Sequence, residues 1–383
     1  MKIKSLKARQ IQNSRGEPAI EVIADGKYAA SAPSGASTGS SEVPTFSKKG
    51  IKFAIDYINK EIPAVTKLDL LEFNDLDVFD RLIPIIGGNP VVALQNAILK
   101  AMSEGNVWKF LNPQAKKFPI PLGNVVGGGK HTKHLSTDFQ EYLLMPTSKN
   151  ISDNILVNSN IHKKMGNILG SREVTDEGAW TTHYSTMEVF ELISSLLEDT
   201  ENTLGIKVKL GIDAAATSLW DGRFYTYRNY SQYVKDKSLN PSEQITAIND
   251  LIGKYSLAYV EDPLNENDFS GFSAISSKNT LLCGDDLVTT NLERLQKALR
   301  SVSVNCIIVK PNQIGSIVQT KKVVDFAMKN DIKCVISHRS GETMDPIISH
   351  FAVAWNIPYI KCGIYGKERT VKLKELELIK EQM

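Results

Sequence analysis

Short apolar runs alternate with amphipathic stretches in the second half of the chain. From about residue 205 onward, six runs rich in strand-forming residues recur, and stretches with helical periodicity separate them. Such alternation is typical of β/α units built on a parallel sheet. The helix candidates lie at 241–255, 291–300, 316–330 and 345–355. The strand candidates are VKLGID (208–213), SLAYVED (256–262), TLLCGDD (280–286), NCIIVK (305–310), KCVISH (333–338) and YIK (359–361).

The first 115 or so residues have a different pattern. Strand-like alternation comes first, with Asp25-Gly26 as a hairpin turn signal. Helical periodicity follows, and Asn89 and Pro90 are expected to cap and begin the longest helix. The strand candidates are 3–11, 19–24 and 27–31, and the helix candidates are 49–60, 75–86 and 91–111. This part of the chain therefore predicts a small α+β domain ahead of the β/α units.

Charged or titratable groups stand at the ends of all six later strand candidates. Polar residues often mark the point where a buried strand reaches solvent, and for one strand that explanation is sufficient. Six such strand ends in succession favour an active site, because the carboxyl ends of parallel barrel strands open onto one face, where active sites lie. The groups are Asp213, Glu261-Asp262, Asp285-Asp286, Lys310, His338-Arg339 and Lys361.

The chemistry of these groups indicates a metal and an anionic substrate. Carboxylates from several strands, with no His or Cys at ligand spacing, form an oxygen site that suits Mg²⁺ or Mn²⁺ rather than zinc. Two lysines can face the same ion only if the substrate is strongly anionic. One lysine could then neutralise the substrate, while the other, with a lowered pKa, acts as a base. A metal beside such a base is a known arrangement for stabilising an ene-diolate.

Composition narrows the range of partners. Lys and Arg number 45 against 43 Asp and Glu, so the net charge of +2 predicts no extended nucleic-acid surface. The N-terminus lacks the apolar region of a signal peptide, and no run approaches the ~20 apolar residues that span a bilayer. We therefore expect a cytoplasmic protein that binds neither nucleic acid nor membrane. The cysteines are expected to be buried, unreactive thiols at Cys283, Cys306, Cys334 and Cys362.

A series of motifs along nearly the whole chain resembles the enolase family, in the family's order. The chain is similar to a short and somewhat diverged member. The motifs are ARQIQNSRGEPAIEV (8–22), SAPSGASTGSSE (31–42), VVGGGKH (125–131), FQEYLLMP (139–146), VTDEG (174–178), GIDAAA (211–216), YVEDPLNENDF (259–269), CGDDLVTTN (283–291), VKPNQIGS (309–316), ISHRSGETMD (336–345) and IKCG (360–363).

This resemblance implies an α/β fold in which an enolase-type (β/α)8 barrel at 118–383 follows an α+β domain at 1–117 with a mobile substrate loop. It implies a lyase, phosphopyruvate hydratase, which reversibly dehydrates 2-phospho-D-glycerate to phosphoenolpyruvate in glycolysis and gluconeogenesis. Two Mg²⁺ per active site are implied, and so is a homodimer, possibly assembled further. Arg15 and Glu17 of the SRGEP segment point to a dimer contact through the N-terminal domain.

The resemblance also implies a role for each residue. Lys310 removes the proton from C2, and Lys361 stabilises the enolate. Glu177, helped by Glu141, acts on the departing C3 hydroxyl, and His131 closes over the substrate. The implied metal ligands are Asp213, Glu261 and Asp285 for the tighter Mg²⁺ and Ser37 for the second. The residues placed against the substrate are Ser37, His131, Glu141, Glu261, Asp285, His338, Arg339, Ser340 and Lys361, of which Arg339 and Ser340 hold the phosphate.

The chain also departs from the family pattern. Gly127 replaces an Asn, Thr175 and Ala179 replace glycines around D-E-G, and IYGKER (364–369) replaces P-A-R-S-E-R. One residue more than usual separates His131 from Glu141. None of these changes removes a charged catalytic group. Two alternatives remain open: another enolase-superfamily enzyme that acts on a different α-carboxylate, and a non-catalytic paralogue.

Overall fold

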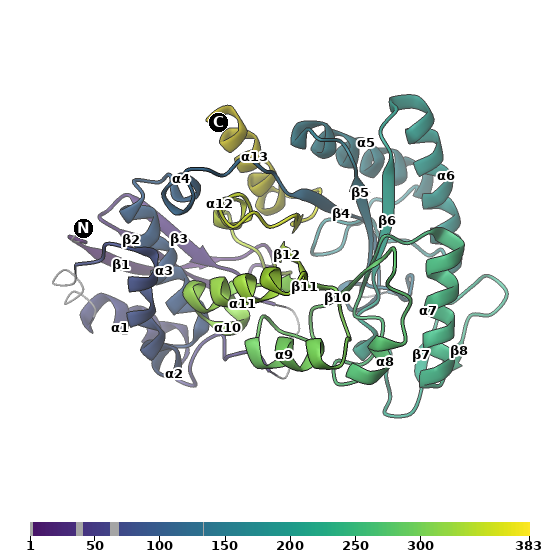
Figure 1. The fold of residues 1–383 in the computed structure, drawn as a ribbon, viewed down its shortest axis with the longest axis horizontal. Coiled ribbons are helices and arrows are strands. Elements are labelled where there is room, and N and C mark those ends of the chain that lie inside the picture. The colour runs from purple at the N-terminus through teal and green to yellow at the C-terminus, as the bar shows by residue number, and fades with distance from the viewer. Residues whose placement is uncertain (1–2, 36–40, 62–68, 133) are drawn as a thin grey trace.

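The N-terminal part is a small antiparallel sheet covered by helices. The structure, a computed structural model, describes residues 3–35, 41–61, 69–132 and 134–383 (Figure 1). Strands β1 (Leu6–Gln12), β2 (Pro18–Ala24) and β3 (Tyr28–Ala32) form a sheet in the order β1-β2-β3. The helices are α1 (Gly50–Glu61), η2 (Phe73–Leu82, a 3₁₀-helix), α2 (Ile83–Ile86), α3 (Gly88–Met102) and α4 (Val107–Leu111). The predicted α+β character of this part is confirmed.

Helix α3 packs on the sheet, and its start differs from the prediction. The helix begins at Gly88, so Asn89 lies inside it and does not cap it. The Asn89 side chain instead donates a hydrogen bond to the carbonyl of Pro33, at 2.7 Å. The single helix predicted at 91–111 is two helices, because the chain turns through left-handed conformations at Glu104 and Gly105. The predicted start of the helix was therefore wrong, because the Asn89 side chain makes a tertiary hydrogen bond and does not cap the helix.

Eight strands close into a barrel in the order β10-β11-β12-β13-β4-β5-β6-β9. They are β4 (Ile120–Gly127), β5 (Glu141–Pro146), β6 (Val208–Asp213), β9 (Tyr259–Glu261), β10 (Leu281–Gly284), β11 (Cys306–Val309), β12 (Lys333–Ser337) and β13 (Tyr359–Lys361). All six strand candidates after residue 205 belong to the barrel. The expected parallel sheet needs one correction, because β5 runs antiparallel to both β4 and β6.

Helices surround the barrel, and their bounds follow the sequence pattern closely. They are α5 (Ile151–Leu169), α6 (Thr186–Leu204), α7 (Pro241–Tyr255), α8 (Phe269–Ser273), α9 (Leu292–Arg300), α10 (Pro311–Ile314), α11 (Ile317–Lys329), α12 (Ile347–Ala354) and α13 (Lys367–Glu381). Smaller elements are the 3₁₀ turns η3 (Gly129–His131) and η4 (Ala216–Ser218) and the hairpin β7 (Tyr225–Tyr227) and β8 (Lys237–Leu239). Asn240 caps α7 with a capping box, and Pro241 begins it. No helix in the described ranges is both long and apolar enough to cross a membrane.

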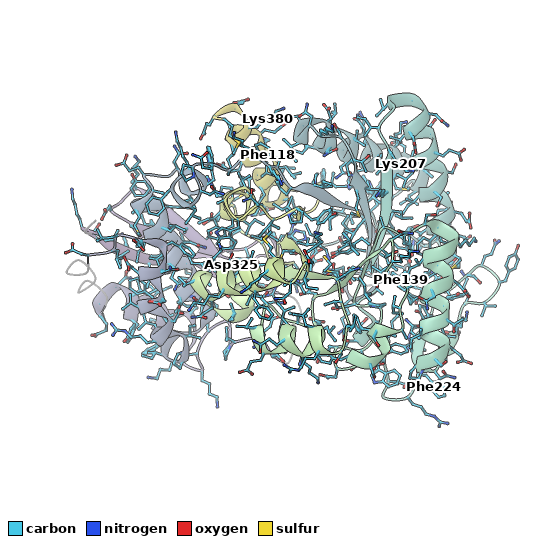
Figure 2. All side chains as sticks on the ribbon, viewed as in Figure 1. Phe118, Phe139, Lys207, Phe224, Asp325 and Lys380 are labelled. Carbon is cyan, nitrogen blue, oxygen red and sulfur yellow. The ribbon has the colours of Figure 1, made fainter. Side chains whose placement is uncertain are left out.

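Side chains fill the barrel and the space around it (Figure 2). Phe139 is fully buried and meets the rings of Tyr142, Phe190 and Tyr227 at tilted or edge-on angles. All four cysteines are buried and free, as expected. Cys283 and Cys306 lie on paired strands and join an apolar cluster with Leu122, Leu143, Met145, Ala258, Tyr259, Ile308 and Val335. This apolar packing supports the polar groups at the strand ends.

The N-terminal part lies against the segment that follows β12. Ser34 and Gly341 exchange backbone hydrogen bonds at 2.9 and 2.8 Å. The Lys100 ammonium group lies 2.7 Å from the Asp345 carboxylate of that segment. The Gln95 side chain accepts from the backbone of Ile317, at the start of α11, at 2.9 Å. Because the segment after β12 carries residues 338–340, the N-terminal part is fixed beside one side of the barrel opening. The domain boundary near residue 117 stays a prediction; α4 ends at Leu111 and β4 begins at Ile120.

Candidate active site

The barrel opening holds a polar cavity of about 280 Å³. Asp213, at the end of β6, is paired with Glu261 of β9 and with Glu141 of β5. Glu141 is the first residue of its strand, but β5 is antiparallel, so its beginning lies at the same edge as its neighbours' ends. The predicted site residues that line the cavity are His131, Glu141, Glu177, Asp213, Asp285, Lys310, His338, Arg339, Ser340 and Lys361. Ser37 lies outside the described residues.

The Lys361 ammonium group is the centre of the charge arrangement. Its Nζ lies 2.9 Å from Glu141 Oε2, 3.0 Å from Asp213 Oδ2 and 2.9 Å from Glu261 Oε2. Burial acts to lower the pKa of Lys361, but the Asp213, Glu141 and Glu261 carboxylates outweigh it and raise the pKa well above its usual value. Lys361 therefore carries a fixed positive charge that joins three strands.

The acids of β9 and β10 are crowded. Burial and the nearby Asp213 raise the pKa of Glu261 to about 8, although Lys361 opposes them. Burial and Asp286 raise the pKa of Asp262, and burial and Asp285 raise the pKa of Asp286 to about 7. The Asp262 carboxylate accepts hydrogen bonds from the backbone of Asp285 at 3.1 Å and of Asp286 at 2.8 Å. It thereby fixes the turn that presents Asp285.

Lys310 and Asp285 form a second, close ion pair. Burial alone lowers the pKa of Lys310, but Asp285 outweighs it and raises that pKa. Burial acts to raise the pKa of Asp285, but the charge of Lys310 outweighs burial and lowers that pKa below its usual value. The expected lowered pKa of the base is thus not supplied by the protein's own groups. Two amides that the sequence did not single out also bind these acids: Gln313 donates to Asp285 at 3.0 Å, and Gln140 donates to Asp213 at 3.2 Å.

Glu141 and Glu177 form a carboxyl pair on the other side of Lys361. Burial raises the pKa of Glu141 well above its usual value, despite Lys361, and a hydrogen bond with Glu177 adds to this. Burial acts to raise the pKa of Glu177 as well, but the charge of His131 and the hydrogen bond from Glu141 lower it. The two pKa values are driven apart, so one proton shared by the pair resides on Glu141.

Two histidines border this pair. His131 Nε2 lies 3.9 Å from Glu177 Oε1, and its Nδ1 lies 2.6 Å from the Asp176 carboxylate. Burial lowers the pKa of His131, but Glu177 and Asp176 together raise it above its usual value. His134 is exposed, so His131 is the histidine of its segment that faces the cavity. His338 approaches the other carboxylate oxygen, with Nε2 at 3.5 Å from Glu177 Oε2.

Arg339 lies at the side of the cavity next to the N-terminal part. Its guanidinium group binds both oxygens of Glu42, each at 3.0 Å, and donates to Asn312 Oδ1 at 2.9 Å. The sequence analysis assigned no role to Glu42, the last residue of the SAPSGASTGSSE segment. A planar guanidinium that binds two oxygens of one anion is the geometry with which arginine holds carboxylates and phosphates.

Among the residues that the structure describes, one group has its metal-ligating atoms within 4.8 Å of one another, and it consists of His131, Glu141 and Glu177. The three predicted metal acids are not in this group. The physical reason is that ammonium groups lie between them: Lys361 contacts Asp213 and Glu261, and Lys310 contacts Asp285. Asp213 and Asp285 nevertheless line the same cavity, whereas Glu261 does not line it and is fully buried against Lys361.

Comparison with known proteins decides the family. The model of the enolase C-terminal TIM barrel domain matches residues 115–383. A protein named enolase from Archaeoglobus fulgidus is 38% identical over 409 residues, which cover 100% of this chain and 98% of the relative. Enolases from Methanosphaera stadtmanae and Halorubrum lacusprofundi are 37% and 36% identical, covering 100% and 98% of this chain and 97% and 98% of the relatives. The chain belongs to the enolase family.

The departures from the enolase pattern are neighbours in space. A Cβ atom placed on Gly127 would lie 2.7 Å from Thr175 Cγ2 and 3.2 Å from Ala179 Cβ. Thr175 and Ala179, which stand where the family has glycines, therefore occupy the space next to Gly127. The changes form one packing unit beneath the turn that carries Glu177, and the carboxylate of Glu177 stays in the cavity.

His162 is buried next to this turn. Its ring stacks on Trp180 and Tyr365, and its Nε2 donates to the carbonyl of Gly178 at 2.9 Å. Gly178 has φ +83°, and a Cβ atom there would lie 2.3 Å from the carbonyl oxygen of Tyr365. The residue after Glu177 must therefore be glycine. Burial lowers the pKa of His162, although the Gly178 carbonyl opposes the shift.

We predict that His162 makes the fold sensitive to mild acid. Its folded pKa lies below the value of about 6.5 expected in the unfolded chain, so below that pH the unfolded state binds more protons. The free energy of unfolding should fall as pH drops, by at most about 1.4 kcal/mol per pH unit for this one proton. In urea denaturation between pH 7.5 and 5, the free energy of unfolding should fall less steeply with pH for His162→Gln than for the parent. His134→Gln, at an exposed position, is the matched control, and an equal slope for His162→Gln and the parent would contradict the assignment.

Proposed function

We propose that this protein interconverts 2-phospho-D-glycerate and phosphoenolpyruvate through an enolate formed by loss of the C2 proton. As a member of the enolase family, the chain is an enzyme, a lyase of the phosphopyruvate hydratase type. The observation that carries the proposal is the placement of different charged groups at different parts of the cavity. Lys361 and Lys310 line it beside Asp213 and Asp285, and the buried Glu261 contacts Lys361. The Glu141–Glu177 pair and an anion-binding arginine, Arg339, also line it.

The acids fit a hard divalent cation. Glu261 Oε1 is buried and has no hydrogen-bond partner among the described residues, and the raised pKa of Glu261 reflects like-charged neighbours that a cation would relieve. We assign Asp213, Glu261 and Asp285 to hold Mg²⁺, because carboxylate oxygens are its preferred protein ligands. Bound there, the ion supplies concentrated positive charge for the substrate carboxylate as C2 loses its proton. Ser37 is the proposed contributor to a second Mg²⁺, on the resemblance of its loop alone.

Lys310 is the proposed base at C2. A lysine must be neutral to accept a proton, and Asp285 keeps Lys310 charged as long as that carboxylate is not engaged elsewhere. Engagement of Asp285 as a ligand would remove this counter-charge and leave burial to lower the lysine pKa. Lys361, whose pKa is raised, suits the other task, because it stays charged and opposes the second negative charge that builds up on the substrate carboxylate.

Glu177 and Glu141 are the proposed acid machinery at C3. Hydroxide is a poor leaving group and needs a proton in the transition state. The pair holds one proton between two carboxyls beside the charged His131, so a proton is available at that side of the cavity. We assign His131, Glu141 and Glu177 to proton transfer and not to metal binding, because the raised pKa of His131 favours a protonated ring without a lone pair for a metal, and Lys361 already contacts Glu141 at 2.9 Å.

Arg339 and Ser340 are the proposed phosphate site, with His338 next to them. The guanidinium of Arg339 is paired with Glu42, so a phosphate that approaches Arg339 competes with that carboxylate. A phosphate with two negative charges is the stronger partner for a planar guanidinium.

The setting of the reaction is likewise proposed. We infer a cytoplasmic glycolytic and gluconeogenic enzyme that forms a homodimer through its N-terminal part. The four free, buried thiols are compatible with a reducing compartment. The support for the dimer is the resemblance at Arg15 and Glu17; within one chain Arg15 contacts Asp176 at 2.9 Å and Glu17 at 3.2 Å.

A coupled assay tests the function directly. The purified chain with Mg²⁺ should convert 2-phospho-D-glycerate to phosphoenolpyruvate, detected by consumption of the product in a second reaction. Turnover of another α-carboxylate, with none of 2-phospho-D-glycerate, would favour a different enzyme of the superfamily. Absence of any turnover, with tight binding retained, would favour a non-catalytic paralogue.

We predict an absolute need for a small divalent cation. Chelation should abolish turnover, and Mg²⁺ should restore it. Asp285→Asn removes a ligand charge and should raise the Mg²⁺ concentration for half-maximal rate by at least about tenfold, or about 1.4 kcal/mol of binding free energy. A second readout is the melting temperature, which Mg²⁺ should raise in the parent and much less in the variant, because a ligand that binds only the folded state stabilises it.

Asp325→Asn is the matched control for the cation test. Asp325 is an exposed acid on α11 that pairs with Lys321 and does not line the cavity. This variant should keep the parental Mg²⁺ response in both measurements. Full turnover of the parent in excess chelator would be incompatible with the proposed metal site.

A further inference from the structure

Arg369, on α13, is a buried cation that the proposed chemistry leaves without a role. It stands at the end of IYGKER, and its residue is 2% exposed. Its guanidinium makes four hydrogen bonds, all to the segments that carry site residues. Nη1 donates to His338 Nδ1 at 2.7 Å and to the carbonyl of Arg339 at 2.6 Å, and Nη2 donates to the carbonyls of Ser340 at 2.6 Å and Asp176 at 3.2 Å.

The partners of Arg369 are all neutral acceptors. Within the described ranges it forms no ion pair, although buried arginines ordinarily depend on one. Burying a charge is costly unless its donors are satisfied, and here three carbonyls and a ring nitrogen satisfy them. These carbonyls belong to consecutive residues after β12 and to the residue before Glu177. The guanidinium therefore ties together the two loops that face each other across the acid pair.

The contact with His338 determines where that ring carries its proton. A guanidinium can only donate, so His338 Nδ1 must be the acceptor, and the ring proton of the neutral imidazole lies on Nε2. Nε2 is the atom that faces Glu177 Oε2 at 3.5 Å. Arg369 thus places a neutral N–H beside Glu177 Oε2, a buried oxygen that has no hydrogen-bond partner among the described residues.

The charges around His338 act in the same direction. Burial lowers the pKa of His338 to about 3, and the charge of Arg369 contributes to the shift. Lys361 also lowers this pKa, whereas Glu177 raises it without reversing the outcome. His131 approaches the other oxygen of the Glu177 carboxylate, with Nε2 at 3.9 Å from Oε1. His338 is therefore neutral throughout the working pH range.

We propose that Arg369 is a positioning residue that locks His338 as the neutral Nε2–H tautomer and fixes the Arg339 and Ser340 backbone against the loop of Glu177. The N–H of His338 then stabilises the ionised form of Glu177, which keeps the shared proton of the pair on Glu141. The orientation of the phosphate-facing residues depends on the same guanidinium. The catalytic consequence rests on the proposed function, but the tautomer of His338 does not.

Nitrogen-15 NMR of histidine side chains in the whole protein tests the tautomer. The chain has six histidines, and the signal missing in His338→Gln identifies His338. In the parent, Nε2 should carry the proton and Nδ1 should have the shift of an acceptor, with no titration from pH 5 to 8. A parent His338 that carries its proton on Nδ1, or that titrates near pH 6.5, overturns the proposal whatever the variants do.

Variants of Arg369 test the cause. Arg369→Met removes the donors and the charge at similar length, so His338 should become a tautomer mixture and titrate at a higher pH. Arg369→Lys keeps a charge and a donor and should restore most of the parental signal. Arg223→Met makes the same change at an exposed arginine and should leave the His338 signals as in the parent. A parental His338 spectrum in a folded Arg369→Met variant would overturn the assignment.

Kinetics separate this role from a merely structural one. With 2-phospho-D-glycerate, Arg369→Met should lose roughly 10–100-fold in turnover, the range seen when the support of a reacting group is removed, and Arg369→Lys should recover part of it. The acid limb of the kcat profile should move in Arg369→Met, because His338 begins to titrate. An unchanged pH profile would contradict the proposal. If the parent fails to turn over this substrate, the proposed function fails, while the NMR result stands by itself.

Discussion

The contact of one ammonium group with three carboxylates is the constraint on which the rest of the site depends. Lys361 Nζ lies within 3.0 Å of acids from three different strands, so the strands must keep their register for its charge to be neutralised. Removal of the ammonium group or of the carboxylates would leave a buried charge without a partner, which costs several kcal/mol. The barrel supplies the required geometry because the ends of β6, β9 and β13 and the beginning of β5 meet at one edge. The excess of acids over lysines at that edge favours the proposed binding of a divalent cation there.

The same arrangement explains why the N-terminal part matters for the chemistry. It reaches the edge of the opening through the Ser34–Gly341 backbone pair and places Glu42 on the guanidinium of Arg339. The segment after β12 is thus held from two directions, by the N-terminal part on one side and by Arg369 of α13 on the other. The substrate would meet a set of charges that are already oriented, and orientation fixed before the reaction is the main source of electrostatic catalysis.

The sequence predicted the parallel strands and their charged ends well, because buried strands with polar ends leave a strong local signal. It could not predict β5 in the same way. That strand is reversed, so Glu141 stands at its start, and only the motif around it pointed to the site. Asn89 was a wrong cap because its amide binds Pro33, a contact 56 residues away. Glu42, Gln313 and Arg369 lie in quoted segments but were given no role, because their roles come from distant contacts. The changes at Gly127 and Ala179 looked unrelated in sequence, and the structure shows one packing unit.

The central claim is that Lys310 and Glu177 act in different halves of the reaction, and exchange of the C2 proton with deuterated solvent tests it most directly. Lys310→Ala should lose both this exchange and dehydration. Glu177→Gln should lose dehydration by roughly 10²–10⁴-fold, the usual scale for a general acid, while it retains C2 exchange. Exchange that survives intact in Lys310→Ala would contradict the account and would make Lys361 the next candidate for the base.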